Sequence, residues 1–552
     1  MSTAADMNGP AGMNGPAPEE KWRRLSPRML VIHPFQEIVR AAPALLGLVF
    51  AGSNSGHSHW WNLAAVGVMV ALGTLRWFTT TYRITAEHVQ VRKGLLNRKV
   101  LTVPRDRVRT VDVTSNILHR LLGLARVEVG TGRSDRKGGG ELKLDALSAP
   151  EAAALREDLL HRANQANRVN PANPQAVPGA STETAPVTAQ ETGTPETVLA
   201  ALSPGWVKYG PFTMSGLITA GVIAGFLGRL TSEGNVDLNR VESLRDGWQW
   251  FTGLSLPVEI VLIMLVLAVF VAVASTCGYV LAFWGFRLTR HTGGTLHVTR
   301  GLVTTRATTI EERRLRGVEV SEPLLLRAAR GARLIAVTTG LRVGRGAQRG
   351  GSMLLPPAPR ARALAVADLV LGHTSGPSPI TAPLTQHGPV ALRRRFTRAL
   401  GVHALLVAAL LALDAWAGLA AWVGVTALVL LPATALMAAD RYRSLGHTLA
   451  SGYLVTRWGS MVRRRVALRC DGVIGWNVER SFFQRRAGLV TLTATTAAGR
   501  QGYAVPDVTL TEALRLASEG SPGLLDPFLI HHVAASTGVA AALDGDPREA
   551  RR

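Results

Sequence analysis

One apolar stretch constrains the fold more than any other part of the sequence. Ile260 to Ala274 contains no charged residue, and the apolar character extends from Pro257 to Trp284. The hydrocarbon core of a bilayer is about 30 Å thick and an α-helix rises about 1.5 Å per residue, so about 20 such residues cross it. We therefore predict a transmembrane helix here, and a purely soluble fold is disfavoured.

Five further stretches have similar length and character, which gives six predicted transmembrane α-helices in three pairs. The pairs are Ile38 to Gly52 with Trp60 to Phe78, Tyr209 to Gly228 with Pro257 to Trp284, and Ala399 to Trp416 with Gly418 to Ala438. The last two spans are almost contiguous, so we expect a tight helical hairpin between them. Buried helices of a globular protein are the alternative, although 47% hydrophobic and only 18% charged residues favour contact with lipid.

The basic residues predict the orientation of these helices. Arg23, Arg24 and Arg28 precede the first span, whereas the loop Ser53 to His59 contains no Arg or Lys. Arg and Lys concentrate on the cytoplasmic side of membrane proteins. We therefore expect a multi-pass protein of the cell membrane with both termini and all large regions in the cytoplasm.

The formal net charge of +23 suggests acidic partners such as phospholipid headgroups or nucleic acid. Arg greatly outnumbers Lys amid frequent Ala and Gly, which is typical of a base-composition bias, and basic loops also serve membrane topology. These two causes account for most of the excess charge, and we predict no nucleic-acid partner.

The three hydrophilic regions repeat one pattern, in which two glycines lie about 30 residues apart. The glycine pairs are Gly94 and Gly123, Gly301 and Gly331, and Gly459 and Gly488. Alternating apolar residues around them predict antiparallel strands, with the first glycine of each pair at positive φ in a hairpin turn. Capping boxes at Ser148 and Glu151 and at Thr509 and Glu512 predict a helix that closes the unit.

This pattern divides the chain into a regular series of segments. We expect a disordered N-terminal tail (1–35), helix pair 1 (36–81), β-rich domain 1 (82–163), a disordered linker (164–204), helix pair 2 (205–285), β-rich domain 2 (286–372), a linker (373–395), helix pair 3 (396–440), β-rich domain 3 (441–520) and a C-terminal tail (521–552).

The first repeat resembles a known family. Val103 to Val113 and Leu118 to Val127 are similar to the signature of bacterial pleckstrin-homology-like (PH-like) membrane proteins of the YdbS/YdbT type, in which helix pairs precede each such domain. The polar part of this signature is lost in the second repeat, at Thr309 to Arg314. The resemblance implies PH-like β-rich domains with a C-terminal helix, and it implies no particular activity.

The apolar residues of the first repeat are dense enough to predict a core. The set that we expect to form it is Leu118, Leu121, Leu122, Val127 and Val129.

No constellation of catalytic residues is present in the sequence. There is no zinc-protease helix, nucleophile-elbow serine, Walker lysine or dinucleotide fingerprint in a suitable context, so we expect no enzyme, no cofactor and no metal site. The acidic residues clearly within the predicted spans are Glu259 and Asp414, both near span ends. A transport path normally uses such residues deeper in the membrane, so transport is disfavoured.

The candidate contact residues lie on glycine-rich basic hairpin loops of the three repeats. They are Arg133, Arg136 and Lys137 in the first, Arg342, Arg345 and Arg349 in the second, and Arg500 in the third. Such loops can be solvated turns, can bind anionic lipid headgroups, or can bind a protein partner at the membrane.

These observations predict a non-enzymatic membrane scaffold that presents three PH-like domains at the cytoplasmic face of the cell membrane. Its partners would be the lipid bilayer, a protein or anionic lipid headgroups, in envelope or stress functions. The alternative is a transporter or channel component that uses the six helices.

Overall fold

The computed structural model describes part of the chain. The described residues are 22–24, 26–29, 67, 71, 75, 78–85, 87–94, 99–105, 110–130, 141–152, 154–155, 196–213, 250, 253–291, 293–339, 352–372, 377–418, 422–525 and 527. They fall into two compact units: the first contains residues 1–381, 461–466 and 497–500, and the second contains residues 382–460, 467–496 and 501–552.

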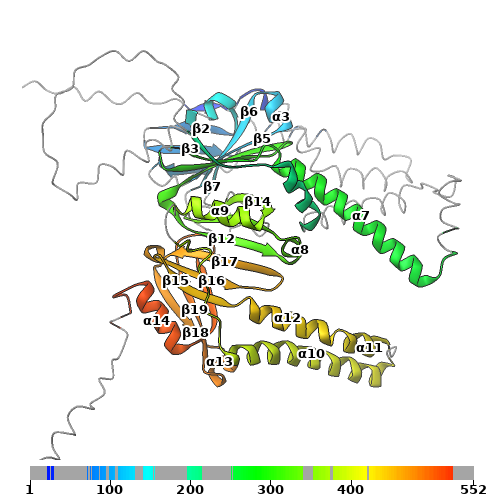
Figure 1. Ribbon diagram of the computed structural model, residues 1–552. Helices are drawn as coiled ribbons and strands as arrows, with labels where there is room; N and C mark the ends of the chain where they lie inside the picture. The colour runs from blue at the N-terminus through cyan, green and yellow to red at the C-terminus, as the bar shows by residue number, and fades with distance from the viewer. Residues whose placement is uncertain are drawn as a thin grey trace, which may run out of the picture. The chain divides into compact units, whose positions relative to one another are not determined.

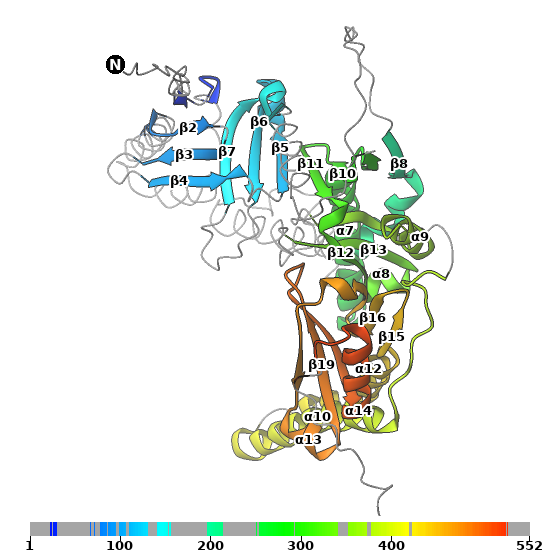
Figure 2. The same ribbon diagram turned by 90° about the vertical axis from the view of Figure 1, so that its left-hand side faces the viewer.

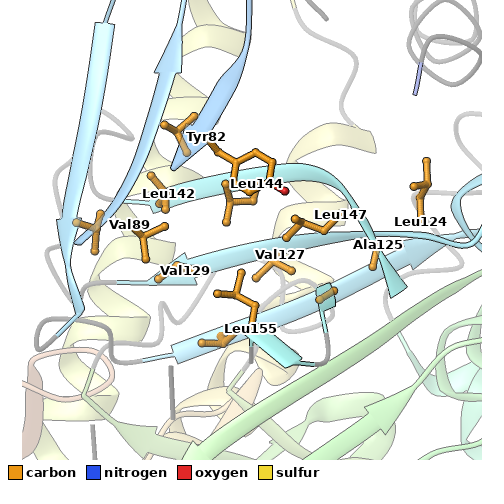
Figure 3. Close-up of a cluster of buried hydrophobic side chains, with 14 of the residues drawn as sticks. Tyr82, Val89, Leu124, Ala125, Val127, Val129, Leu142, Leu144, Leu147 and Leu155 are labelled. Carbon is orange, nitrogen blue, oxygen red and sulfur yellow. The ribbon is translucent and has the colours of Figure 1, made fainter. Parts of the chain in front are cut away.

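The first β domain consists of two sheets that enclose a core. One sheet has the order β1 (Arg23–Arg24), β2 (Thr81–Ile84), β3 (His88–Lys93) and β4 (Lys99–Pro104), and the other contains β5 (Thr110–Asn116), β6 (Leu124–Gly130) and β7 (Glu141–Ser148). The short helix α3 (Ile117–Leu121) connects β5 and β6. Figure 3 shows Tyr82 and Val89 facing Val129, Leu142 and Leu144 across this core, all of them buried.

The second β domain repeats this order of elements. Its elements are β8 (Glu196–Ala201), β9 (Arg287–His291), β10 (Thr295–Arg300), β11 (Thr304–Glu311), β12 (Leu315–Pro323), α8 (Leu324–Ala328), β13 (Gly331–Thr338), β14 (Met353–Pro359) and α9 (Arg360–Val370). The short 3₁₀-helices η2 (Pro204–Phe212) and η4 (Glu312–Arg314) accompany them. Helix α8 connects β12 and β13, just as α3 connects β5 and β6 in the first domain.

One sheet serves both of these domains. Its order is β7-β6-β5-β11-β10-β9-β8, and antiparallel pairing of β5 with β11 joins the two halves (Figures 1 and 2). Asp112 lies opposite Thr308, so these two side chains point to the same face. Side chains alternate along a strand, and therefore Val111 faces the core of the first domain while Ile310 faces the core of the second, on the opposite side of the sheet.

The second unit contains the third β domain and the helices before it. Helices α10 (Pro389–Ala417), α11 (Trp422–Val429) and α12 (Leu431–Arg443) precede β15 (Gly446–Ala450), β16 (Tyr453–Trp458) and β17 (Val462–Arg469), of which 462–466 belong to the first unit. The 3₁₀-helix η5 (Cys470–Gly472), β18 (Gly475–Glu479), α13 (Phe482–Arg486), β19 (Leu489–Thr495), β20 (Gly502–Thr509) and α14 (Leu510–Gly520) follow. The order of elements therefore occurs a third time.

Two described helices are long and apolar enough to cross a membrane, namely α7 (Leu256–Phe283) and α10. The prediction of six such helices is thus supported only in part. The predicted spans 38–52 and 60–78 lie almost wholly outside the described residues, and of 209–228 only the start is described, where Tyr209 belongs to η2. The sixth span is divided into α11 and α12, because Pro432 in the first turn of α12 has no N–H to continue the helix.

Several predicted boundaries need correction. Residues 196–201, which we placed in a disordered linker, form β8 because they pair with β9. The N-terminal tail is ordered in part, since Arg23 and Arg24 pair with β2 and Met29 is buried. Helix α10 begins at Pro389, inside the predicted linker, because Pro is favoured in the first turn of a helix. Leu121 is 81% exposed and does not belong to the core.

The predicted turn glycines are confirmed by the backbone. Gly94, Gly301 and Gly459 have φ values of 109°, 105° and 100°, in the region that favours glycine. Gly418, at the end of α10, has φ 62° and makes the tight turn that the helical hairpin requires. The capping box at Ser148 and Glu151 is also formed, with both reciprocal hydrogen bonds present.

We expect Gly301→Ala to destabilise the second β domain by about 1–3 kcal/mol. The substitution places a Cβ atom 2.1 Å from the carbonyl oxygen of Thr304, at a φ that L-residues rarely adopt. Hydrogen exchange of the β10 and β11 amides in the whole protein measures the loss. Gly293→Ala is the matched control, because its Cβ meets nothing within 4 Å and it should cost less than about 1 kcal/mol. Equal protection in the two variants would contradict this reading of the turn.

Candidate functional site

Most of the predicted contact residues lie outside the described residues. Those are Arg133, Arg136, Lys137, Arg342, Arg345 and Arg349. Arg500 is described, and it pairs with Glu319, with 3.2 Å between its Nε and Oε2. The role of these loops in lipid or protein contact stays a prediction.

Glu319 is the centre of a charged cluster in the first unit. Its buried carboxylate also pairs with Arg464, with 3.2 Å between Nε and Oε1. Burial lowers the pKa of Arg464 and of the neighbouring Arg333. A buried carboxylate held by two guanidinium groups is a structural element, so Arg500 serves the fold whatever else it contacts.

Exposed apolar residues surround the C-terminal end of α7. The turn after β10 is attached to this end, because Gly301 N donates to Trp284 O and Leu302 N donates to Leu281 O, both at 2.9 Å. Helix α3 is attached to the same turn through a hydrogen bond of 3.1 Å from Arg120 Nη1 to Leu302 O. The exposed residues that result, which we call the apolar lip, are Ile117, Leu121, Trp284, Leu302 and Val303.

The same feature recurs at the corresponding short helix of the other two domains. In the first unit, α8 exposes Leu324 and Leu325, and Leu324 N donates to Met461 O at 2.8 Å, with Met461 also exposed. In the second unit, α13 exposes Phe482 and Phe483. Each domain therefore presents large apolar side chains at one equivalent position.

The start of α10 is bound to the third domain by a buried carboxylate. Asp507, which is 1% exposed, pairs with Arg394 and with Arg395, in the latter case with 2.5 Å between Nη2 and Oδ2. Gln484 of α13 donates to the same carboxylate at 3.0 Å, and Arg394 also donates to Ser481 Oγ at 3.4 Å. Because the contacts join α10, α13 and β20, the exposed Phe482 and Phe483 lie near the start of a membrane-length helix (Figure 1).

Two buried histidines extend this contact. His387 Nδ1 lies 3.1 Å from the carbonyl oxygen of Asp507, and its Nε2 lies 3.1 Å from His447 Nδ1. His447 Nε2 lies 3.0 Å from Glu512 Oε1. A carbonyl can only accept, so His387 Nδ1 donates to Asp507, and the facing His387 Nε2 and His447 Nδ1 share one proton. The contacts thus run without a break from Asp507 to Glu512.

Burial disfavours a charge on His387 and shifts the pKa values along this chain. Burial, together with the charge of His447, lowers the pKa of His387 to about 4. Hydrogen bonds from Arg515 and His447 hold the pKa of Glu512 at about 2, below its ordinary value. Glu512 therefore serves this chain in addition to the predicted capping site, where its backbone N–H binds Thr509 Oγ1 at 3.3 Å.

A polar cavity of about 130 Å³ lies where β5 meets β11. Its charged lining consists of Asp112, Arg126, Glu128, Arg300 and Arg306, and His119 of α3 borders it. None of these cavity residues was among the candidate residues predicted from the sequence. The available signal was the alternation in β5, where Asp112, Thr114 and Asn116 occupy the face opposite the core, but alternation does not reveal which strand lies alongside.

Comparison with known families accounts for the threefold order of elements. A family model described as "Bacterial PH domain" matches residues 39–163, 237–372 and 402–521, which is most of the chain. The chain belongs to the bacterial PH domain family. Each match covers one of the three β domains together with residues before it, so these are three PH domains. No curated protein and no solved structure matches the chain.

Proposed function

We propose that the protein is a non-enzymatic scaffold of the cell membrane that holds its three PH domains against the cytoplasmic face, where they bind a protein or anionic lipid. In this proposal six helices cross the membrane in three pairs and both termini are cytoplasmic, as in the YdbS/YdbT type of architecture. The basic loops with Arg133, Arg136 and Lys137 are candidate contacts for anionic headgroups.

The observation that carries the proposal is the apolar lip. Most side chains along α7 are exposed, including Val261, Met264 and Phe270, so a lipid environment is what would cover this helix. The lip continues that apolar surface from the end of α7 onto α3 and the turn after β10. Trp284 at this position is typical of the membrane interface, where an indole has one apolar and one polar environment. A PH domain attached in this way would rest on the bilayer.

The fold supports the same geometry in the third domain. Arg394 and Arg395 hold the start of α10 against Asp507, which limits the freedom of the PH domain relative to that helix. Phe482 and Phe483 are adjacent to this junction through the contact of Arg394 with Ser481. A similar arrangement in separate repeats favours membrane contact over a chance exposure of single residues.

We expect fluorophores on the apolar lip and on the exposed face of α13 to report a membrane environment. Single cysteines at Leu121 and Phe483, in a background with Cys277→Ala and Cys470→Ala, are labelled with an environment-sensitive dye in the whole protein. After reconstitution into anionic bilayers, their emission should shift to the blue and be quenched by brominated lipids. Both effects should persist at high salt, because apolar contact is not screened.

Val198 provides the matched control. It is an exposed apolar residue on β8 in the same unit as Leu121, and it is not part of the lip. A label there should show aqueous emission and little quenching. If labels at Leu121 and Phe483 behave like the label at Val198, the PH domains stand away from the bilayer and the proposed contact is wrong.

A further inference from the structure

The cavity between β5 and β11 has an ordered arrangement of charge. Arg300, Arg306, Thr114 and Arg126 are successive cross-strand neighbours on β10, β11, β5 and β6, so their side chains form one row on one face of the sheet. Two residues further along the strands, Thr308, Asp112 and Glu128 form a second row on the same face. Three guanidinium groups thus border one side of the cavity and two carboxylates border the other.

Each row contains like charges in directly opposed positions. Arg300 is opposite Arg306, and Asp112 is opposite Glu128. Like charges directly opposite each other on neighbouring strands are destabilising. The two rows lie about 7 Å apart along the strands, which is two residues at about 3.3 Å each. Attraction between the rows offsets part of this repulsion, since Asp112 and Arg300 attract each other. A ligand with a negative group over the first row and a positive group over the second would match the charge pattern of the cavity.

Arg300 is a buried member of the first row. Arg300 is 8% exposed and lies between the cavity and the core of the second PH domain, where its guanidinium group stacks 5.5 Å from the Phe283 ring. Burial lowers its pKa to about 10, with Arg306 contributing in the same direction. Buried charges are normally paired, and Arg300 Nη1 also donates to Met353 Sδ at 3.2 Å.

Asp112 gives a second, independent observation. Its Oδ1 is buried and accepts no hydrogen bond from the described residues. A buried carboxylate oxygen without a donor is costly and is rare in folded proteins. The missing donor would be an ammonium or hydroxyl group in the cavity.

We propose that this cavity binds a small zwitterion that carries a phosphate group and an ammonium group. The phosphate would bind Arg126, Arg300 and Arg306, and the ammonium would bind Asp112 and Glu128. A cavity of about 130 Å³ has the volume of about four water molecules, which restricts the ligand to a small headgroup-sized compound.

Two sources of this chemistry exist, namely a zwitterionic phospholipid headgroup and a free aminoalkyl phosphate. Asn116 and His119 border the cavity, and Ile117 and Leu121 of the apolar lip are on the same short segment. The lipid source therefore rests on the membrane contact proposed above, whereas the free source does not.

The test is a calorimetric titration of the whole protein in detergent micelles with phosphoethanolamine. Inorganic phosphate and ethanolamine are titrated separately, since each matches one row only. We expect phosphoethanolamine to bind at least about tenfold more tightly than either, because a charge-assisted hydrogen bond contributes about 1.5–3 kcal/mol. If inorganic phosphate binds as tightly, or if phosphoethanolamine does not bind, the proposal is wrong.

Single substitutions test the contribution of each charged row to binding. Asp112→Asn should weaken the binding of phosphoethanolamine by about tenfold and leave the binding of inorganic phosphate unchanged. Arg306→Gln should weaken the binding of both compounds. Arg327→Gln on α8 removes the same charge outside the cavity lining and should change neither. Hydrogen exchange of β5 and β11 shows whether each variant retains its fold. If folded Asp112→Asn weakens the binding of both compounds equally, the ammonium group does not bind Asp112 and the proposed orientation of the ligand is wrong.

Nanodiscs then identify the source. If the lipid headgroup is the ligand, protein in phosphatidylethanolamine nanodiscs should no longer bind added phosphoethanolamine, because lipid fills the site, while protein in phosphatidylglycerol nanodiscs should still bind it. Equal binding in the two kinds of nanodisc indicates the free compound. The micelle titration tests the ligand of the cavity, and the fluorophore experiment tests the membrane contact. A negative result in one experiment therefore leaves the other proposal standing.

Discussion

Asp507→Asn is expected to destabilise the third PH domain by about 3–5 kcal/mol, because it leaves the guanidinium groups of Arg394 and Arg395 without their shared counter-charge. Asn has nearly the same shape as Asp and also tolerates the left-handed backbone, which matters because Asp507 has φ 62°. The loss therefore reports the buried charge and not the backbone. Hydrogen exchange of the β20 amides in the whole protein measures it, since β20 carries Asp507 and pairs with β19.

Asp471→Asn is the control for this variant. Asp471 also pairs with an arginine in the second unit, with 2.6 Å between its Oδ2 and Arg469 Nη2, but both side chains are about half exposed. Exposed ion pairs contribute about 0–1 kcal/mol, so this change should scarcely alter exchange from the same strand. Similar losses from the two variants would show that burial of Asp507 does not make its ion pairs important.

The ion pairs of Asp507 should also restrain the start of α10. If the pairs of Asp507 fix the start of α10 against the domain, Asp507→Asn should also raise hydrogen exchange near Arg394 before global unfolding occurs. A domain that is released in this way would lose the fixed position of Phe482 and Phe483 beside α10. Quenching of a label at Phe483 by brominated lipids should then fall in the variant, which connects the stability of the junction to the proposed membrane contact.

Local patterns in the sequence were sufficient to predict the repeated elements. Positive φ at Gly94, Gly301 and Gly459 is required by a hairpin turn, and a turn is defined by a few adjacent residues. The capping box at Ser148 and Glu151 is likewise complete within four residues. The helix α7 was evident because its apolar run is long enough to cross a bilayer and has no charged residue from Ile260 to Ala274.

The shared sheet could not be predicted, because strand pairing is not a local property. Alternation in β5 shows that Asp112 and Val113 point to opposite faces, but it does not show that β11, almost 200 residues away, lies alongside. The cavity depends on that pairing, so its residues appeared in the sequence as ordinary outward-facing polar side chains. Their role became evident only when four strands placed them in two rows.

Arg500 illustrates the same limit for single residues. The sequence places it on a basic hairpin loop, which favours solvent or lipid contact. Its carboxylate partner Glu319 is 181 residues away, and nothing in the loop itself indicates that partner. Leu121 is the opposite case: an apolar residue in an apolar run was assigned to the core, whereas the amphipathic turn of α3 leaves it exposed.

The stability of the third PH domain is expected to fall by about 3 kcal/mol as the pH decreases from 6.5 to about 4, because of His387. The folded-state pKa of His387 is about 4, below its ordinary value of 6.5, since burial and the charge of His447 oppose protonation. Between these two values the unfolded chain binds a proton that the folded domain does not, so acid favours unfolding. Above pH 6.5 the imidazole is neutral in both states and contributes no pH dependence.

The other groups around His387 determine how this prediction is tested. His447, Arg395 and the carbonyl of Asp507 face its ring, and the depressed pKa of Glu512 adds a second loss of stability only below about pH 4.5. The comparison is therefore made between pH 7 and pH 5, with exchange of β15 and β20 amides corrected for the intrinsic pH dependence of exchange. Wild-type protection should decrease over this range, and His387→Asn, which cannot be protonated, should flatten the profile.

His88→Asn is the matched control for the histidine variant. His88 has a much more exposed side chain, and it belongs to the first unit, so its loss should leave the pH profile of β15 and β20 unchanged. A wild-type profile that is flat between pH 7 and pH 5 would mean that His387 is protonated in the folded domain. In that case the proton between the two rings lies on His387 Nε2, and His447 Nδ1 accepts it.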